Sequence, residues 1–169
     1  PALAAIAERG LDHLTAALFW QKTGTNGIHV PYRGGGPAIN DLIAGHANVS
    51  FQNLGAIAQH VKSGRLKALA VTSGQRVATL PDVPTMAEAG VKGFGIDSWM
   101  GIFAHSNTPP AVLAKLRAET RAILPSLKPT LEKVGGNLIE ISDAETGPFI
   151  QKEYDMWTKV IRDAGIKLD

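Results

Sequence analysis

The feature that most constrains the fold is the order in which helical patterns and short apolar runs alternate along the chain. Leu11, Leu14 and Leu18 recur at the spacing of one helix face. A β-branched run follows at residues 28–32, and a second helical pattern then ends at Gly45. Short strands that alternate with helices favour a parallel sheet with crossover helices. We therefore predict an α/β fold.

The same alternation continues to the end of the chain, with one more helix expected at the start, around Leu3 and Ile6. Proline lacks an N–H group and clashes with the carbonyl four residues before it. We therefore expect Pro125 and Pro129 to break the helix that begins at residue 110. The remaining predicted helices are 54–61, 85–90 and 144–164, and the remaining predicted strands are 49–51, 66–71, 94–104 and 138–141.

One helix start carries a complete capping signal. Thr85 and Glu88 have the spacing of a capping box, in which each side chain accepts a hydrogen bond from the other residue's backbone N–H. Gly90 follows at the place where a glycine commonly ends a helix. This pattern predicts the short helix over residues 85–90.

Composition excludes several classes of protein. The chain has 169 residues, 44% hydrophobic and 19% charged, which suits one globular domain. The net charge of +2 is spread without a run of like charges, so neither nucleic acid nor a membrane surface is an expected partner. There is no cysteine, and no pair of histidines has the i, i+4 spacing of a helical zinc site. We expect no metal and no cofactor.

The most informative local feature is a glycine-rich loop between an expected strand and an expected helix. Three consecutive glycines let the backbone turn its N–H groups outward at a helix N-terminus, which carries a partial positive charge. The spacing is that of neither a phosphate-binding P-loop nor a dinucleotide fold, so a carboxylate is the favoured ligand. The alternative is a tight strand-to-helix turn without a ligand. The candidate residues are Tyr32, Gly34, Gly35, Gly36, Pro37 and Ala38.

Polar side chains also follow the next expected strand. In an open α/β sheet, ligands gather outside the carboxyl ends of the strands. Gln52 and Asn53, beside Ser50, would orient a ligand there without reacting with it. The alternative role for Asn53 is to cap the helix that begins at Leu54.

A catalytic apparatus is not evident. The sequence has no Gly-x-Ser-x-Gly elbow and no Ser-x-x-Lys pair, and it places no paired carboxylates at expected strand ends. An α/β enzyme remains an alternative, with an anionic substrate at Gly34–Gly36 and Asp97 or a histidine as the base. A detached interaction domain is a third possibility.

Several ordered motifs together resemble one family, the solute-binding proteins of tripartite tricarboxylate transporters, also called the Bug family. The resemblance extends from about Leu11 to the end of the chain. Its motifs are HVPYRGG (29–35), LKALAVTS (66–73), LPDVPTMAEAG (80–90), SWMGIFA (98–104), Thr108-Pro109 and the ending 157–167.

The resemblance implies a two-lobed, type II periplasmic binding protein. Residues 1–94 would form the second lobe, and 95–169 would return to the first lobe, whose N-terminal part, together with one carboxylate-binding loop before Leu11, would be missing. Members of the family hold ligand carboxylates through backbone amides, hydroxyl groups and waters. The implied function is non-catalytic, periplasmic binding of a small carboxylate, by a monomer, for delivery to membrane transporter subunits. Dicarboxylates, tricarboxylates, aromatic acids and amino acids are the candidate solutes.

Overall fold

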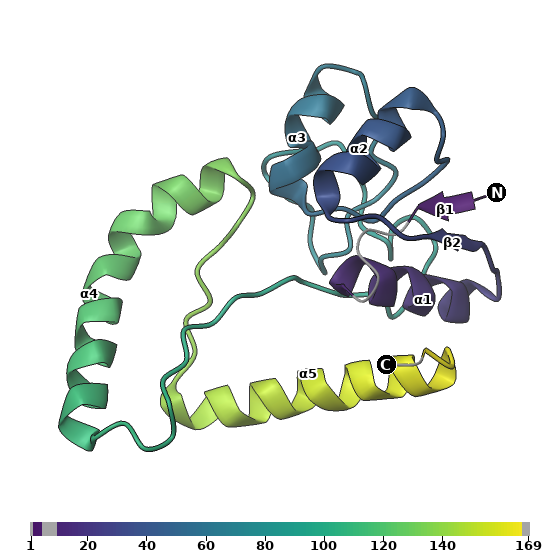
Figure 1. Ribbon diagram of the computed structural model, residues 1–169. Helices are drawn as coiled ribbons and strands as arrows, with labels where there is room; N and C mark the ends of the chain where they lie inside the picture. Colours follow the sequence, from purple (N-terminus) through teal and green to yellow (C-terminus); the bar gives the residue numbers. More distant parts are fainter. Residues whose placement is uncertain (1, 5–9, 167–169) are drawn as a thin grey trace.

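The computed structural model describes residues 2–4 and 10–166 (Figure 1). Two short strands and five helices follow one another along the described residues, so the expected α/β class is confirmed. Their bounds are β1 Ala2–Ala4, α1 Leu11–Thr23, β2 Ile28–Val30, α2 Gly35–Ala44, α3 Leu54–Lys62, α4 Pro110–Lys133 and α5 Asp143–Asp163.

Strands β1 and β2 pair in parallel, with Leu3 opposite His29. The helix expected around Leu3 is therefore wrong at that residue, while Ile6 lies outside the described residues. The two residues with helical spacing, Leu3 and Ile6, are too few to nucleate a helix, whereas the parallel partner strand supplies backbone hydrogen bonds. The pairing joins the first described residues to the strand that leads into the glycine-rich loop.

Helix α1 and the end of α5 pack around the principal core. The buried cluster consists of Ala17, Leu18, Met86, Phe94, Ile96 and Val160. The rings of Phe19 and Phe51 pack against Phe94 at centroid distances of 6.5 and 6.4 Å, in the range of favourable aromatic contacts. Residues far apart in sequence thus share one core.

The helices expected over 11–18, from the glycine-rich loop to Gly45, over 54–61 and over 144–164 all form. Helix α1 continues five residues beyond the expected pattern, to Thr23. Helix α2 ends at Gly45, whose φ of 79° is left-handed, as predicted. Helix α5 begins with a capping box of Ser142 and Glu145. Of the described helices, none is both long and apolar enough to cross a membrane.

The strands expected at 49–51, 66–71, 94–104 and 138–141 do not form in the described part of the chain. Val71 makes an isolated parallel bridge to Thr85, and its N–H donates to the carbonyl of Pro84 at 2.8 Å. An extended segment becomes a strand only when a neighbour completes its ladder of hydrogen bonds. Within the described residues, no neighbour completes such a ladder along these four segments.

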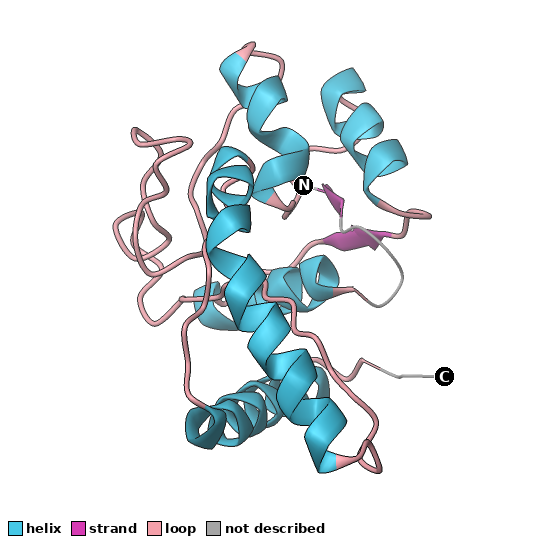
Figure 2. Cartoon of the chain, turned by 90° about the vertical axis from the view of Figure 1, so that its left-hand side faces the viewer, coloured by secondary structure: helices cyan, strands magenta, loops and turns pink. Residues whose placement is uncertain are grey.

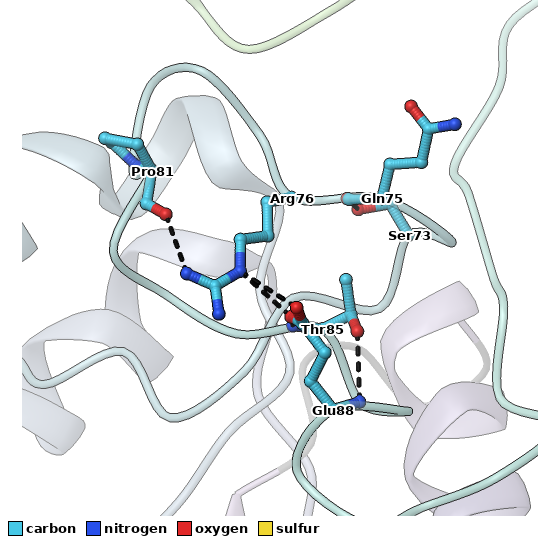
Figure 3. Close-up of polar contacts among 6 residues, drawn as sticks. All are labelled: Ser73, Gln75, Arg76, Pro81, Thr85 and Glu88. Atoms are coloured by element: carbon cyan, nitrogen blue, oxygen red, sulfur yellow. Dashed lines mark hydrogen bonds and ion pairs between the residues drawn. The ribbon is translucent and has the colours of Figure 1, made fainter.

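Residues 85–90 form a turn, so the short helix expected there is wrong, although its capping box is present. The N–H of Thr85 donates to Oε2 of Glu88 at 2.8 Å, and the N–H of Glu88 donates to Oγ1 of Thr85 at 3.2 Å. Figure 3 shows that Arg76 binds both the Glu88 carboxylate and the carbonyl of Pro81. This arginine lowers the pKa of Glu88. Gly90 has a φ of 101°, which stops the turn before helical propagation begins.

Helix α4 runs unbroken from Pro110 to Lys133, so the break expected at Pro125 and Pro129 is wrong. Proline costs a helix one hydrogen bond and a steric clash, which a helix can absorb by bending. Figure 1 shows α4 as a curved helix set apart from α1 and α2, and Figure 2 shows it from the front. None of its residues is buried.

Candidate functional site

The glycine-rich loop leaves β2 and enters α2 through a backbone that only glycine adopts readily. Gly34 is the N-cap residue, with φ 96° and ψ 174°. A Cβ added at Gly34 or at Gly36 would meet no atom within 4 Å. The loop therefore faces open space on the side where these two residues lie.

Unpaired donors line this loop. The N–H groups of Gly34, Gly35 and Gly36 have no intrahelical acceptor by position, and Pro37 has no N–H to satisfy. No hydrogen bond from these three groups is found within the described ranges, and no side chain caps the helix. The side chain of Ala38, by contrast, is fully buried and anchors the first turn. The loop has the donor geometry of an anion site.

Tyr32 is tied to the helix that follows it. Its hydroxyl donates to Oδ2 of Asp41 at 2.8 Å, and this hydrogen bond, with the nearby negative charge, raises the pKa of the phenol. Asp41 Oδ1 also lies 3.5 Å from Nδ1 of His46. Asp41 was not predicted as a site residue, and its only signal in the sequence is its position nine residues after Tyr32, on the helix that follows the loop.

The polar groups at the start of α3 are arranged differently. Gln52 donates from Nε2 to the hydroxyl of Ser50 at 2.7 Å. Asn53 holds the N-cap position of α3, yet its exposed side chain makes no capping hydrogen bond. The alternative role of Asn53 as a side-chain cap is therefore wrong, and its amide remains available at the surface. Figures 1 and 2 show α2 and α3 as neighbours at one end of the molecule.

The beginning of α3 also touches the end of α4. A Cβ on Gly55 would lie 3.3 Å from the carbonyl oxygen of Val134, and one on Gly135 would lie 2.3 Å from Cδ2 of Leu54. Gly135 has a φ of 78°. Two glycines thus permit the C-terminal part of the chain to approach next to Asn53.

The groups named for the alternative enzyme lie elsewhere. Asp97 lines a hollow of about 610 Å³ with Leu11, Trp99 and side chains of α5, and none of Tyr32, Gly34–Gly36 or Asn53 lines that hollow. His13 and His29 stack with ring centroids 4.0 Å apart between α1 and β2. Within the described ranges, no three His, Asp or Glu side chains gather as metal ligands do.

The class of protein that shares this architecture is the periplasmic binding proteins. The chain resembles the periplasmic binding protein BugD at a TM-score of 0.85 and 31% identity, over 98% of this chain and 57% of that one. The chain resembles Rpa4515 of R. palustris with adipate at a TM-score of 0.85 and 30% identity, over 97% of this chain and 56% of that one. It resembles MatC from Rhodopseudomonas palustris with bound malate at a TM-score of 0.82 and 26% identity, over 95% and 56% of the two chains.

The chain belongs to the tripartite tricarboxylate transporter family receptor (TctC) family, whose sequence profile matches residues 3–166. It is 35% identical over 159 residues to Protein BugT of Bordetella pertussis, covering 92% of this chain and 48% of BugT. The expected Bug-family resemblance is confirmed. The chain spans about half the length of BugT and 56% of each of the solved chains of Rpa4515 and MatC.

Proposed function

We propose that this chain contains a carboxylate-binding site of a periplasmic receptor. The receptor binds a small dicarboxylate and delivers it to a tripartite membrane transporter. The observation that carries the proposal is the run of N–H groups at Gly34, Gly35 and Gly36 at the N-terminus of α2. These groups have no intrahelical acceptor by position and no hydrogen-bond partner within the described ranges, and Gly34 and Gly36 face open space. Such donors favour an anion and supply no general acid or base.

The family relationship supports the chemical class of ligand. Two similar receptors were solved with adipate and with malate, which are both dicarboxylates. In this chain, the loop at 34–36 would hold one carboxylate through backbone N–H groups. The exposed amide of Asn53 and the Gln52–Ser50 pair would supply hydrogen bonds at the neighbouring helix start.

We assign residues 1–94 to the second lobe and 95–169 to a segment that returns to the first lobe. The contact of Leu54 with Gly135 joins these two parts of the chain beside Asn53. We place the ligand cleft at this junction, where closure would bring the two lobes together. Ligand binding would favour closure because the closed state offers the ligand more contacts.

Isothermal titration with adipate, malate, citrate, an aromatic acid and an amino acid tests the proposal. We expect at least one dicarboxylate to bind with 1:1 stoichiometry. Gly35→Val should abolish that binding and leave the helical circular dichroism unchanged, because a branched side chain blocks the approach of the ligand to the backbone. Gly74→Ala, in an exposed loop with space around it, is the matched control. Binding that survives Gly35→Val would overturn the assignment of the loop.

A further inference from the structure

The part of the chain that carries the glycine-rich loop is poor in carboxylates. Residues 13–81 contain six lysines and arginines but a single acidic residue, Asp41. Both oxygens of this carboxylate are already engaged, because Oδ2 accepts from the hydroxyl of Tyr32 at 2.8 Å and Oδ1 lies 3.5 Å from Nδ1 of His46. The loop therefore lies in a stretch of positive charge that its own acidic group does not balance.

Arg33 is the cationic residue closest to the loop in sequence. It directly precedes Gly34, the N-cap residue of α2, and it is exposed. Within the described residues, its guanidinium makes no hydrogen bond and no ion pair. Five N–H donors of fixed geometry are thus free beside the N–H groups of the loop.

Three other arginines of the chain are held by carboxylates. Figure 3 shows Arg76, whose Nε donates to both oxygens of Glu88. Arg117 and Arg121 each bind a different oxygen of Asp143 at 2.9 Å. Where arginine joins two segments of this chain, the structure supplies its carboxylate. The arginine before the loop has no such partner, so a structural ion pair does not account for it.

A dicarboxylate such as adipate or malate brings two negative charges to the site proposed above. The N-terminus of α2 carries about half a positive charge, and the N–H groups of the loop suit one carboxylate. The side chains of Gln52 and Asn53 are neutral amides. Bound through these groups alone, the second carboxylate has no cationic partner. A guanidinium binds a carboxylate through two parallel N–H···O hydrogen bonds.

We propose that Arg33 is the specificity-determining residue of this site. Its guanidinium binds the second carboxylate of a dicarboxylate whose first carboxylate occupies the loop at 34–36. This role of Arg33 rests on the proposed function. Backbone N–H groups accept any carboxylate, so selection for ligands with two carboxylates falls to this one side chain. Ion pairs in solvent are weak, whereas charge-assisted hydrogen bonds to a bound ligand are stronger, so the expected loss is partial.

The test compares each dicarboxylate with the acid in which a methyl group replaces one carboxylate. The pairs are adipate with hexanoate and malate with 2-hydroxybutyrate. Isothermal titration of the whole 169-residue chain at pH 7.5 gives the affinity of the dicarboxylate, and its displacement gives that of the monocarboxylate. Arg33→Gln should lower the preference for the dicarboxylate about tenfold, by weakening the dicarboxylate alone.

Two further variants separate the guanidinium from the general positive charge. Arg33→Lys keeps the charge and loses the planar fork, so it should retain part of the preference. Arg65→Gln is the matched control, because Arg65 is also exposed, lies in the same carboxylate-poor stretch and makes no ion pair within the described residues. It should bind every acid as the unsubstituted chain does. Circular dichroism and the melting temperature should be the same in all three variants.

The possible results distinguish the role of Arg33 from the proposed function itself. Absence of dicarboxylate binding, or binding that survives Gly35→Val, would overturn both. Binding that depends on Gly35 but is unchanged in Arg33→Gln would overturn the role of Arg33 alone. An equal loss of both acids of a pair in Arg33→Gln, or the same loss in Arg65→Gln, would also overturn it, because a solvated surface cation would then explain the effect.

Discussion

The hydroxyl of Tyr32 donates a 2.8 Å hydrogen bond to Oδ2 of Asp41, which ties the residue before the glycine-rich loop to the middle of α2. The same aspartate reaches the other end of the helix, because its backbone carbonyl accepts from the N–H of His46 at 2.9 Å. One residue therefore links the entry and the exit of α2. The glycine-rich loop lies between Tyr32 and Asp41, and within the described residues its own N–H groups have no hydrogen-bond partner.

Tyr32→Phe should weaken dicarboxylate binding severalfold with little change in the melting temperature. The substitution keeps the ring and removes the one hydrogen bond that fixes the loop against Asp41. Isothermal titration and thermal unfolding measure the two effects. Tyr154→Phe, at an exposed tyrosine of α5, should bind as the unsubstituted chain does. Equal affinity in both variants would mean that the hydrogen bond does not organise the loop.

Gly34→Ala should destabilise the fold by about 1 to 3 kcal/mol, because its backbone conformation is costly for any residue with a Cβ. Gly36→Ala has equal space around it and no positive φ, so it should be neutral or stabilising by up to about 1 kcal/mol. Urea unfolding of the two variants gives the comparison. Equal stabilities would show that the loop does not need the positive φ of Gly34.

Gly135→Ala should destabilise the contact between the ends of α3 and α4. The new Cβ would lie 2.3 Å from Cδ2 of Leu54, in addition to the strain of a φ of 78°. Gly64→Ala has a similar φ of 73° and open space, so it carries the strain without the clash. We expect Gly135→Ala to cost about 1 to 3 kcal/mol more than Gly64→Ala.

Adding Leu54→Ala should recover part of that difference, because it removes the atom that clashes. The double-mutant cycle is measured by urea unfolding. If Gly135→Ala and Gly64→Ala cost the same, Leu54 has room to move and the approach of α4 to α3 is loose.

Features that depend on neighbours in sequence were predictable, and those that depend on distant partners were not. The C-terminal glycine of α2 and the capping box of Thr85 and Glu88 are local, and both were found. The strand at 66–71 needs a ladder from elsewhere in the chain, and within the described residues this segment has a single isolated bridge, at Val71. The continuity of α4 through Pro125 reflects bending, which local propensity does not report.

The candidate site likewise has one part that could be predicted from the sequence and another part that depends on tertiary contacts. Three consecutive glycines at 34–36 indicate by residue type alone a backbone conformation that other residues rarely adopt, so the loop could be predicted from the sequence. Asp41 and the Leu54–Gly135 contact are tertiary relationships, and no local pattern distinguishes them. Ala38 was grouped with the loop because it is adjacent to it, whereas its side chain belongs to the core.

The pH dependence of stability should show the influence of Asp12, in the first turn of α1. Burial raises the pKa of this carboxyl from 3.8 to about 6. Below pH 3.8 the group is protonated in both states and imposes no cost. As the pH rises to 6, the unfolded chain releases its proton first, so the free energy of unfolding falls. Above pH 6 the carboxylate is ionised in both states, and its burial destabilises the folded chain by the full amount.

Asp12→Asn should therefore stabilise the chain at pH 7.5 by about 1 to 2 kcal/mol and have little effect at pH 3.5. The full pKa shift overstates the gain, because the side chain is only partly buried and the N-terminus of α1 favours a carboxylate. Urea unfolding at the two pH values measures the difference, with Asp82→Asn, in an exposed turn, as the control. A stabilisation by Asp12→Asn that is the same at both pH values would show that the ionisation of Asp12 is not its source.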